Sequence, residues 1–189
     1  TTGWPYGAFE YTVPLGPMLA GVIPVALPVF FFPLVLNAYL LTLLLLGDRA
    51  DNTAVRLAAT VGAVLATDLV LDPGAVAVKF WAYECAATAS CGYYGVPWSN
   101  YAGWVLSATV AVLAFDQGLD RTGLKARLRE CEFMLDDLVS FVLLWGGINA
   151  LYGNWIPVAI AVALGVGLLT TDRFDFAIGD SALVRAVRR

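Results

Sequence analysis

Residues 72–100, DPGAVAVKFWAYECAATASCGYYGVPWSN, separate two long apolar segments and decide how the rest of the chain is arranged. Long connections without regular structure are usually functional or disordered, and the density of tryptophan and tyrosine in this one argues against disorder. Its part from 74 to 87 is apolar apart from Lys79 and Glu84, which predicts an interfacial or re-entrant helix. We interpret the whole stretch as the lid or wall of a site.

The composition of the chain is that of an integral membrane protein. Of its 189 residues, 60% are hydrophobic and only 14% are charged, and the mean hydropathy is +0.76. Histidine is absent, which removes the commonest protein ligand of haem and catalytic zinc and the commonest general base. The net charge of -4 makes nucleic acid a poor partner. We therefore expect no metal, no cofactor and no nucleic acid, and the low lysine content fits a halophile.

The apolar segments predict an all-α, polytopic bundle of about five membrane-spanning helices. A helix that crosses the hydrocarbon layer needs roughly 20 apolar residues. We expect one transmembrane domain over residues 1–171, followed by a charged tail at 172–189. The segments that qualify, or nearly do, are 19–46, 54–71, 101–115, 133–151 and 156–170.

The distribution of basic residues predicts the orientation of this bundle. Every Lys and Arg except Lys79 falls in segments on one side of the predicted spans. By the positive-inside rule that side is cytoplasmic, which makes the protein a multi-pass component of the cell membrane. The cytoplasmic segments are then 47–53, 116–132 and the tail, and the outer segments are 1–18, 72–100 and 152–155.

Two acids near the end of the second apolar segment are the strongest candidates for chemistry. Asp68 and Asp72 are four residues apart, so they share one helical face, about one turn inside the outer boundary. A charged Asp near the bilayer centre costs on the order of 3 kcal/mol and usually faces a cavity or a partner. Two carboxyls in such a place can share one proton at neutral pH. The alternative is structural: Asp72 ends the helix before Pro73, and Asp68 bonds to a neighbouring helix.

Other polar residues each allow a structural and a functional interpretation. Asn37 is expected to bridge two helices by a hydrogen bond. Ser99 or Asn100 is a candidate N-cap for the third span. Cys85 and Cys91 either pair in the outer segment or pack as small residues. For one group of acids there are two interpretations. Either these acids pair with nearby arginines along their own helix, or they form a cytoplasmic site for a metal or a diphosphate. These acids are Glu130, Glu132, Asp136 and Asp137.

Buried carboxyls among aromatic rings suit the acid-catalysed addition of water to an alkene. A neutral Asp donates a proton, the faces of Trp and Tyr stabilise the carbocation, and a Tyr or Asn orients the water that attacks it. This reaction requires neither a metal nor a redox cofactor.

Several motifs together resemble the carotenoid 1,2-hydratase family of carotenogenic membrane proteins, over almost the whole chain. The most specific is GYYGVPWSNYAGW at 92–104, and the others are GWPYGAFEYT (3–12), LGP (15–17), DLVLDP (68–73) and ECEFMLDDLVSFVLLWGGINALYGNW (130–155). Members of this family carry further hydrophobic sequence upstream of GWPYG. The first residues, TTGWPYGAFEY, also lack the basic region of a signal peptide and resemble an interior loop. Either the natural protein continues upstream, or the N-terminal helices of the family are not part of this polypeptide.

The resemblance implies hydration of the terminal 1,2 double bonds of an acyclic C50 carotenoid, giving the tertiary hydroxyls of bacterioruberin. Protonation at C2 leaves a tertiary cation at C1, to which water adds. On depth, side and chemistry we assign the acid to Asp68 or Asp72, with Glu84 or Glu10 as the alternative acid or base. The candidate substrate- and water-binding residues are Tyr11, Trp81, Tyr94, Trp98, Asn100, Trp104 and Asn149.

Two other functions remain open at this point. A membrane prenyltransferase would bind a magnesium diphosphate at Asp-rich motifs, for which the acids between Glu130 and Asp137 are the candidates. A non-catalytic carotenoid-binding subunit would use the same aromatic pocket without chemistry. In each case the expected partners are a long apolar carotenoid, the lipid bilayer and other membrane enzymes of the carotenoid pathway. The oligomeric state is open.

Overall fold

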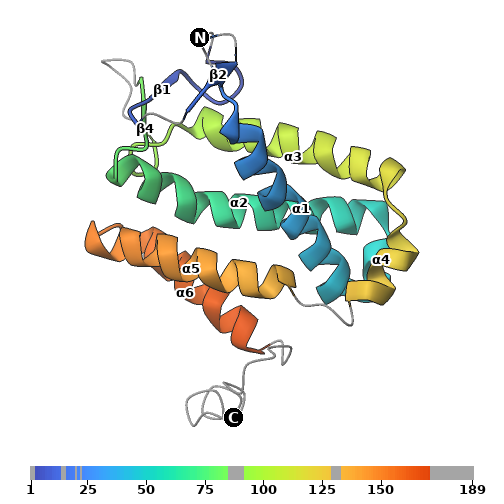
Figure 1. Ribbon diagram of the computed structural model, residues 1–189. Coiled ribbons are helices and arrows are strands. Elements are labelled where there is room, and N and C mark those ends of the chain that lie inside the picture. The colour runs from blue at the N-terminus through green and yellow to red at the C-terminus, as the bar shows by residue number, and fades with distance from the viewer. Residues whose placement is uncertain are drawn as a thin grey trace.

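The computed structural model describes residues 3–13, 16–19, 21, 23–84, 92–128 and 133–170, and this part of the chain is mainly helical (Figure 1). Short strands accompany the helices at one end. The helices are α1 (Ala26–Leu46), η1 (Gly47–Asp51), α2 (Thr53–Ala77), α3 (Trp98–Gly118), α4 (Arg121–Leu128), α5 (Phe133–Leu151) and α6 (Trp155–Thr170). The strands are β1 (Phe9–Tyr11), β2 (Met18–Leu19), β3 (Ile23–Pro24) and β4 (Trp81–Tyr83).

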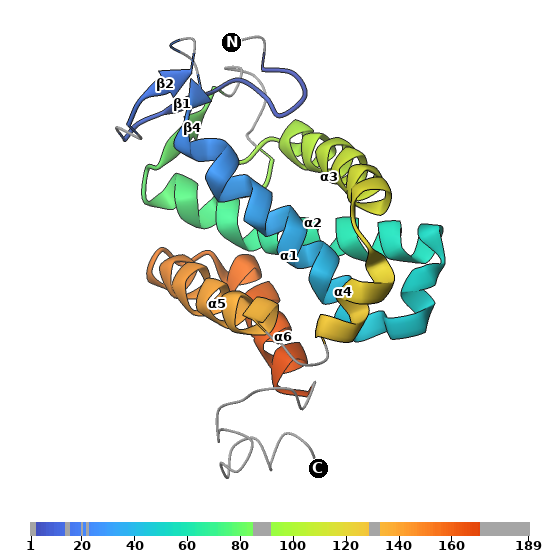
Figure 2. The ribbon, with the colours of Figure 1, turned by 45° about the vertical axis from the view of Figure 1, so that its right-hand side comes forward.

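Helix α2 is the centre of the bundle. It packs against α1, α3, α5 and α6, and α5 and α6 also pack against each other. Figures 1 and 2 show α3 on one side of α2 and the α5–α6 pair on the other, with α1 crossing α2. Because α2 has neighbours on several sides, a polar residue in its second half is enclosed by protein rather than by lipid.

The described helices confirm the all-α membrane class. Two segments, Phe31–Asp51 and Thr53–Ala77, are long and apolar enough to cross a membrane. Helices α3 and α4 meet at an angle of 98° and make a third span if they are taken together. The apolar helix Trp155–Leu168 is shorter. The structure thus supports two or three spans, and the predicted number of five stays a prediction.

The structure corrects the boundaries expected around residues 72–100. Helix α2 does not end before Asp72 but runs through Pro73 to Ala77. Pro73 lacks the N–H that would bond the Leu69 carbonyl, and membrane helices tolerate this loss where other helices pack against them. Asn154 Nδ2, in the turn before α6, donates to the Pro73 carbonyl at 3.4 Å. Of the separate helix predicted over 74–87, residues 74–77 are helical but belong to the end of α2. The prediction is wrong for residues 78–84, which turn into β4. The first span is also shorter than expected, since α1 begins only at Ala26.

Strand β4 is held by the N-terminal segment. It pairs antiparallel with β1, so that Phe9 lies opposite Tyr83 and Tyr11 lies opposite Trp81. Beyond this pair, the Ile156 amide donates to the hydroxyl of Tyr94 at 3.3 Å. The N-terminal strands, β4, the start of α3 and the turn between α5 and α6 therefore form one end of the bundle, the strand end (Figure 1).

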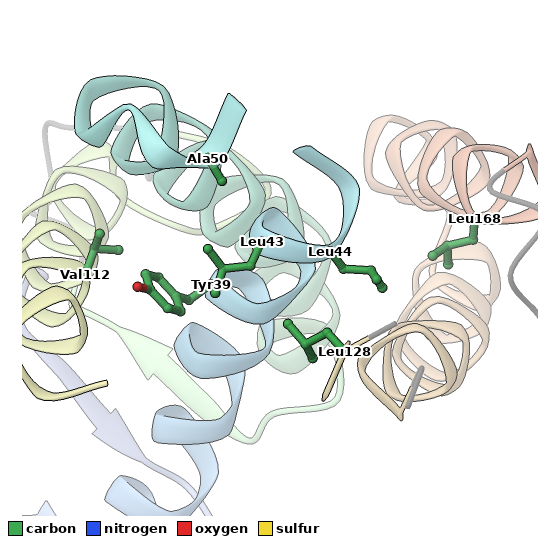
Figure 3. Packing of buried hydrophobic residues seen from close by; sticks show 7 residues of the cluster. All are labelled: Tyr39, Leu43, Leu44, Ala50, Val112, Leu128 and Leu168. Atoms are coloured by element: carbon green, nitrogen blue, oxygen red, sulfur yellow. The ribbon is translucent and has the colours of Figure 1, made fainter. Parts of the chain in front are cut away.

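The opposite end, formed by η1 and α4, carries most of the described basic residues, and we call it the basic end. A core cluster of Tyr39, Leu43, Leu44, Ala50, Val112, Leu128 and Leu168 joins α1, η1, α3, α4 and α6 there (Figure 3). Beside it, the buried Arg56 donates from Nε to Asp116 Oδ1 at 2.8 Å and pairs through Nη2 with Asp116 Oδ2. The Tyr39 hydroxyl donates to the same Asp116 Oδ1 at 2.8 Å. This network fixes α1, α2 and α3 to one another.

Candidate active site

Asp68 and Asp72 lie one turn apart on the side of α2 that faces α3, and both are buried, with 0% and 2% of their surface exposed. Asn100, in the first turn of α3, joins them. Its Nδ2 lies 3.1 Å from Asp68 Oδ2 and 2.5 Å from Asp72 Oδ2. The expected cap role of Asn100 is wrong, because Pro97 occupies the N-cap position and the Asn100 side chain turns to the acids.

Tyr83 supplies a second donor to one acid only. Its hydroxyl donates to Asp72 Oδ2 at 2.8 Å from strand β4. Burial, followed by the charge of Asp72, raises the pKa of Tyr83, so its hydroxyl keeps its proton and acts as a donor. Asp72 Oδ2 thus accepts two hydrogen bonds, whereas Asp68 accepts one from Asn100.

Asp68 Oδ1 and the Tyr101 hydroxyl are both buried and have no hydrogen-bond partner among the described residues. Tyr101 follows Asn100 in α3 and lies close enough to Asp68 to interact with it electrostatically. Such groups are rare in folded proteins because an unmade hydrogen bond costs about 1–3 kcal/mol. The indole N–H of Trp81 is also buried without a partner among the described residues. Asp68 Oδ1, the Tyr101 hydroxyl and this N–H are therefore polar groups of the site that remain available to a water or a substrate.

The sequence singled out Asp68, Asp72 and Asn100, which the structure brings together, but it did not single out Tyr83 and Tyr101. The signal for Tyr101 was its place directly after Asn100 in the motif at 92–104. Tyr83 had a weaker signal, the alternation of Trp81 and Tyr83 in a short aromatic run.

The predicted aromatic residues divide into a buried and an exposed group. Trp104 is buried against Phe31 and Tyr6, with ring centroids 5.1 and 6.0 Å away. Trp81 is buried in a cluster with Leu71 and Trp145, against which Tyr11 and Tyr83 pack.

Burial raises the pKa of Tyr11 to about 12, so it too remains protonated. Trp98, by contrast, is 64% exposed, and the hydroxyl of Tyr94 is engaged with the start of α6. The structure thus buries Trp81 and Trp104 in two separate clusters, leaves Tyr11 half-buried beside Trp81, and leaves Trp98 on the surface.

Two predicted acids and one predicted amide do not contact the Asp68–Asp72 pair. Glu10 and Glu84 are exposed at the strand end and are not brought to the Asp68–Asp72 pair. Asn149 is buried, but its Nδ2 donates to the carbonyls of Val70 and Trp145, at 2.7 and 2.8 Å. This amide therefore ties α5 to α2.

The expected cytoplasmic acid group is only partly described. Cys85, Cys91, Glu130 and Glu132 lie outside the described residues. Asp137 accepts a hydrogen bond from Asn37 Nδ2 at 2.5 Å, which confirms that Asn37 bridges two helices. Within the described ranges no three acidic or thiol side chains come together as a metal site.

A groove of about 380 Å³ opens on a neighbouring face of α2, between α1, α2, α5 and α6. Thr67 and Leu71 line it, and each directly precedes one of the acids. Consecutive helical residues point about 100° apart, so the groove and the acid pair occupy adjacent faces of α2. The acid pair itself is not part of the groove lining.

Comparison with known proteins shows the family of the chain. Residues 1–168 match the family of carotenoid biosynthesis proteins. The chain is 65% identical over 188 residues to a protein of Haloarcula japonica named bisanhydrobacterioruberin hydratase. That alignment covers 100% of the chain and 62% of the relative, so the chain spans less than two thirds of the relative's length. No solved structure matches the chain. By the family match and this identity, the chain belongs to the carotenoid biosynthesis protein family.

Proposed function

We propose that the protein adds water to a terminal double bond of a long acyclic carotenoid, converting bisanhydrobacterioruberin to bacterioruberin. The observation that carries the proposal is the buried Asp68–Asn100–Asp72 cluster, in which Tyr83 donates a hydrogen bond to Asp72 but not to Asp68. The name of the Haloarcula japonica relative supports the same reaction. Addition of water to an alkene needs an acid, a site that tolerates a cation, and a water. The cluster and its aromatic neighbours offer the first two.

The unequal hydrogen bonding of the two acids supports different roles for them. Two donors stabilise negative charge on Asp72, whereas Asp68 has a free oxygen, so a proton shared by the pair resides on Asp68. Asp68 transfers this proton to the less substituted alkene carbon, and a tertiary cation forms on its neighbour. The carboxylate of Asp72 and the faces of Trp81 and Trp104 stabilise that cation.

Water then completes the reaction. Its oxygen bonds to the tertiary carbon, and the proton that it loses returns to Asp68, which restores the starting state. Tyr101 and Asn100 are the polar groups best placed to orient this water, with Tyr11 as a further candidate at the edge of the aromatic cluster. Glu10 and Glu84 remain alternative proton carriers at the surface.

The proposal includes the number of membrane spans and the orientation of the protein in the membrane. Lys79 is the one Lys or Arg among the described residues near the strand end, whereas Arg49, Lys125 and Arg127 lie at the basic end. This asymmetry supports five spans with the strand end on the outer face and the C-terminus in the cytoplasm. The substrate would enter from the bilayer, and other membrane enzymes of the pathway are candidate partners.

The experiment is expression in a host that accumulates bisanhydrobacterioruberin, with the pigments followed by mass spectrometry. The proposal predicts a gain of one or two waters per pigment, which is lost in the Asp68→Asn/Asp72→Asn double variant. Pigment that co-purifies unchanged with the wild-type protein would instead indicate a carotenoid-binding subunit.

A further inference from the structure

The groove between α1, α2, α5 and α6 is apolar except for one polar pair. Most of its lining consists of side chains such as Leu34, Leu41, Phe141 and Leu144. Two of its hydroxyl residues are satisfied by their own helices. Thr67 Oγ1 donates to the Val64 carbonyl at 2.8 Å, and Ser140 Oγ donates to the Asp136 carbonyl at 3.2 Å. The remaining polar residues of the lining are Asn37 and Asp137.

Asn37 and Asp137 have unused hydrogen-bonding capacity. One N–H of Asn37 is spent on Asp137 Oδ2, at 2.5 Å. No bond is found within the described ranges for the second N–H of Asn37 or for Asp137 Oδ1, and Asp137 has no basic partner there. A hydroxyl group complements both, because it donates to the carboxylate and accepts from the amide.

We infer that this groove binds a long apolar chain that carries a hydroxyl group, with the hydroxyl held between Asn37 and Asp137. The groove extends along α2 from Ala63 to Leu71, which is about 12 Å at the rise of an α-helix. The apolar part of the ligand lies along the leucines and the phenylalanine of the lining. Its hydroxyl group meets the polar pair, Asn37 and Asp137. That the bound ligand is an acyclic carotenoid rests on the proposed function.

The groove also leads toward the candidate active site. Leu71 and Trp145 line its wall and belong to the same buried cluster as Trp81, against which Tyr83 packs. A chain anchored at Asn37 and Asp137 thus runs toward the aromatic residues beside Asp72. The groove therefore selects acyclic carotenoids that already bear a hydroxyl over pure hydrocarbons.

The test compares the binding of two probes to the detergent-solubilised protein: lycopene, and a lycopene that carries one tertiary hydroxyl. Binding is followed by quenching of tryptophan fluorescence, because Trp145 lines the groove. Hydrogen bonds to a charged group predict a preference of about tenfold or more for the hydroxylated probe. The Asn37→Leu/Asp137→Leu variant should lose this preference and bind lycopene as the wild type does.

Two control variants keep the test interpretable. The exchange Asn37→Asp/Asp137→Asn retains a polar pair between α1 and α5 and should keep most of the preference even if the leucine variant is unstable. Ser140→Ala removes a groove hydroxyl that is already bonded to its own helix, so the preference should not change. Equal affinity of the wild-type protein for both probes would overturn the inference and leave a site for any apolar chain, such as a lipid acyl chain.

Binding and conversion are read separately. Conversion is measured on bisanhydrobacterioruberin, the proposed substrate. Tighter binding of the hydroxylated probe by a protein that leaves bisanhydrobacterioruberin unchanged would support the groove and contradict the proposed function. Hydration of bisanhydrobacterioruberin by a protein that binds both probes with equal affinity would contradict the groove alone.

Discussion

The side-chain amide of Asn100 contacts both acids of α2, with its Nδ2 at 3.1 Å from Asp68 Oδ2 and 2.5 Å from Asp72 Oδ2. Its two hydrogens allow one nitrogen to serve both carboxyls. The acids therefore behave as one unit whose geometry is set by α3.

Replacing Asn100 by leucine should impair both activity and stability. The change removes a shared donor from two facing buried carboxyls, which costs about 1–3 kcal/mol and should lower hydration by about 10–100-fold. Hydration rates and thermal unfolding in detergent measure the two effects. Ser99→Ala is the control, because Ser99 is exposed one residue earlier in α3. An Asn100→Leu variant with wild-type rates would show that the pair needs no common donor.

Tyr83→Phe should reduce hydration by about 10–100-fold while leaving the fold intact. It removes one of the two hydrogen bonds to Asp72 Oδ2, and a bond to a charged group is worth about 1.5–3 kcal/mol. Initial rates on solubilised pigment provide the measurement. The matched change Tyr152→Phe affects a tyrosine that is 57% exposed and should have no effect. Equal rates for the two variants would argue against a role for the Tyr83 hydroxyl.

The acid pair could be predicted from sequence because charged residues four apart in an apolar helix are a local pattern. Tyr83 could not, because its position depends on the pairing of β4 with β1, whose residues are some seventy positions away. Such a short strand pair leaves little periodicity in the sequence. The contact between Tyr83 and Asp72 arises only when the N-terminal segment folds back over α2.

Helix boundaries were predictable where the apolar pattern ends in ordinary turn residues. Helix α5 occupies 133–151 as expected, and α6 begins one residue before the predicted start. The end of α2 was missed because the residue before a proline is biased away from helix, which made Pro73 a natural stop. Packing against α5 overrides that local preference, since Gly74 lies directly against Trp145.

Gly74→Ala should destabilise the protein by about 1–3 kcal/mol through overpacking. A Cβ at this position would lie 2.9 Å from Trp145 Cε3 and 3.2 Å from Asn149 Nδ2, in a well-packed contact between α2 and α5. Gly62→Ala in the same helix is the control, because nothing lies within 4 Å of its added Cβ. Thermal unfolding midpoints of the two variants should differ clearly. Identical midpoints would contradict the close packing at Gly74.

Arg56→Met should destabilise the basic end by about 3–5 kcal/mol, because it leaves Asp116 without its main partner. Arg56 is buried, and Asp116 binds it through both carboxylate oxygens. The double variant Arg56→Met/Asp116→Leu removes both charges and should recover part of the loss. Unfolding in detergent measures both proteins. A double variant less stable than the single one would contradict the argument.

The most direct test of the central claim, that Asp68 is the proton donor, is hydration of bisanhydrobacterioruberin by the purified protein in ¹⁸O-labelled water. Mass spectrometry should detect labelled hydroxyls with the wild-type protein and with the control Asp48→Asn, which changes an exposed acid at the basic end. Loss of a general acid predicts a rate lower by about 10²–10⁴-fold for Asp68→Asn. Labelled product formed by Asp68→Asn at the wild-type rate would contradict the account.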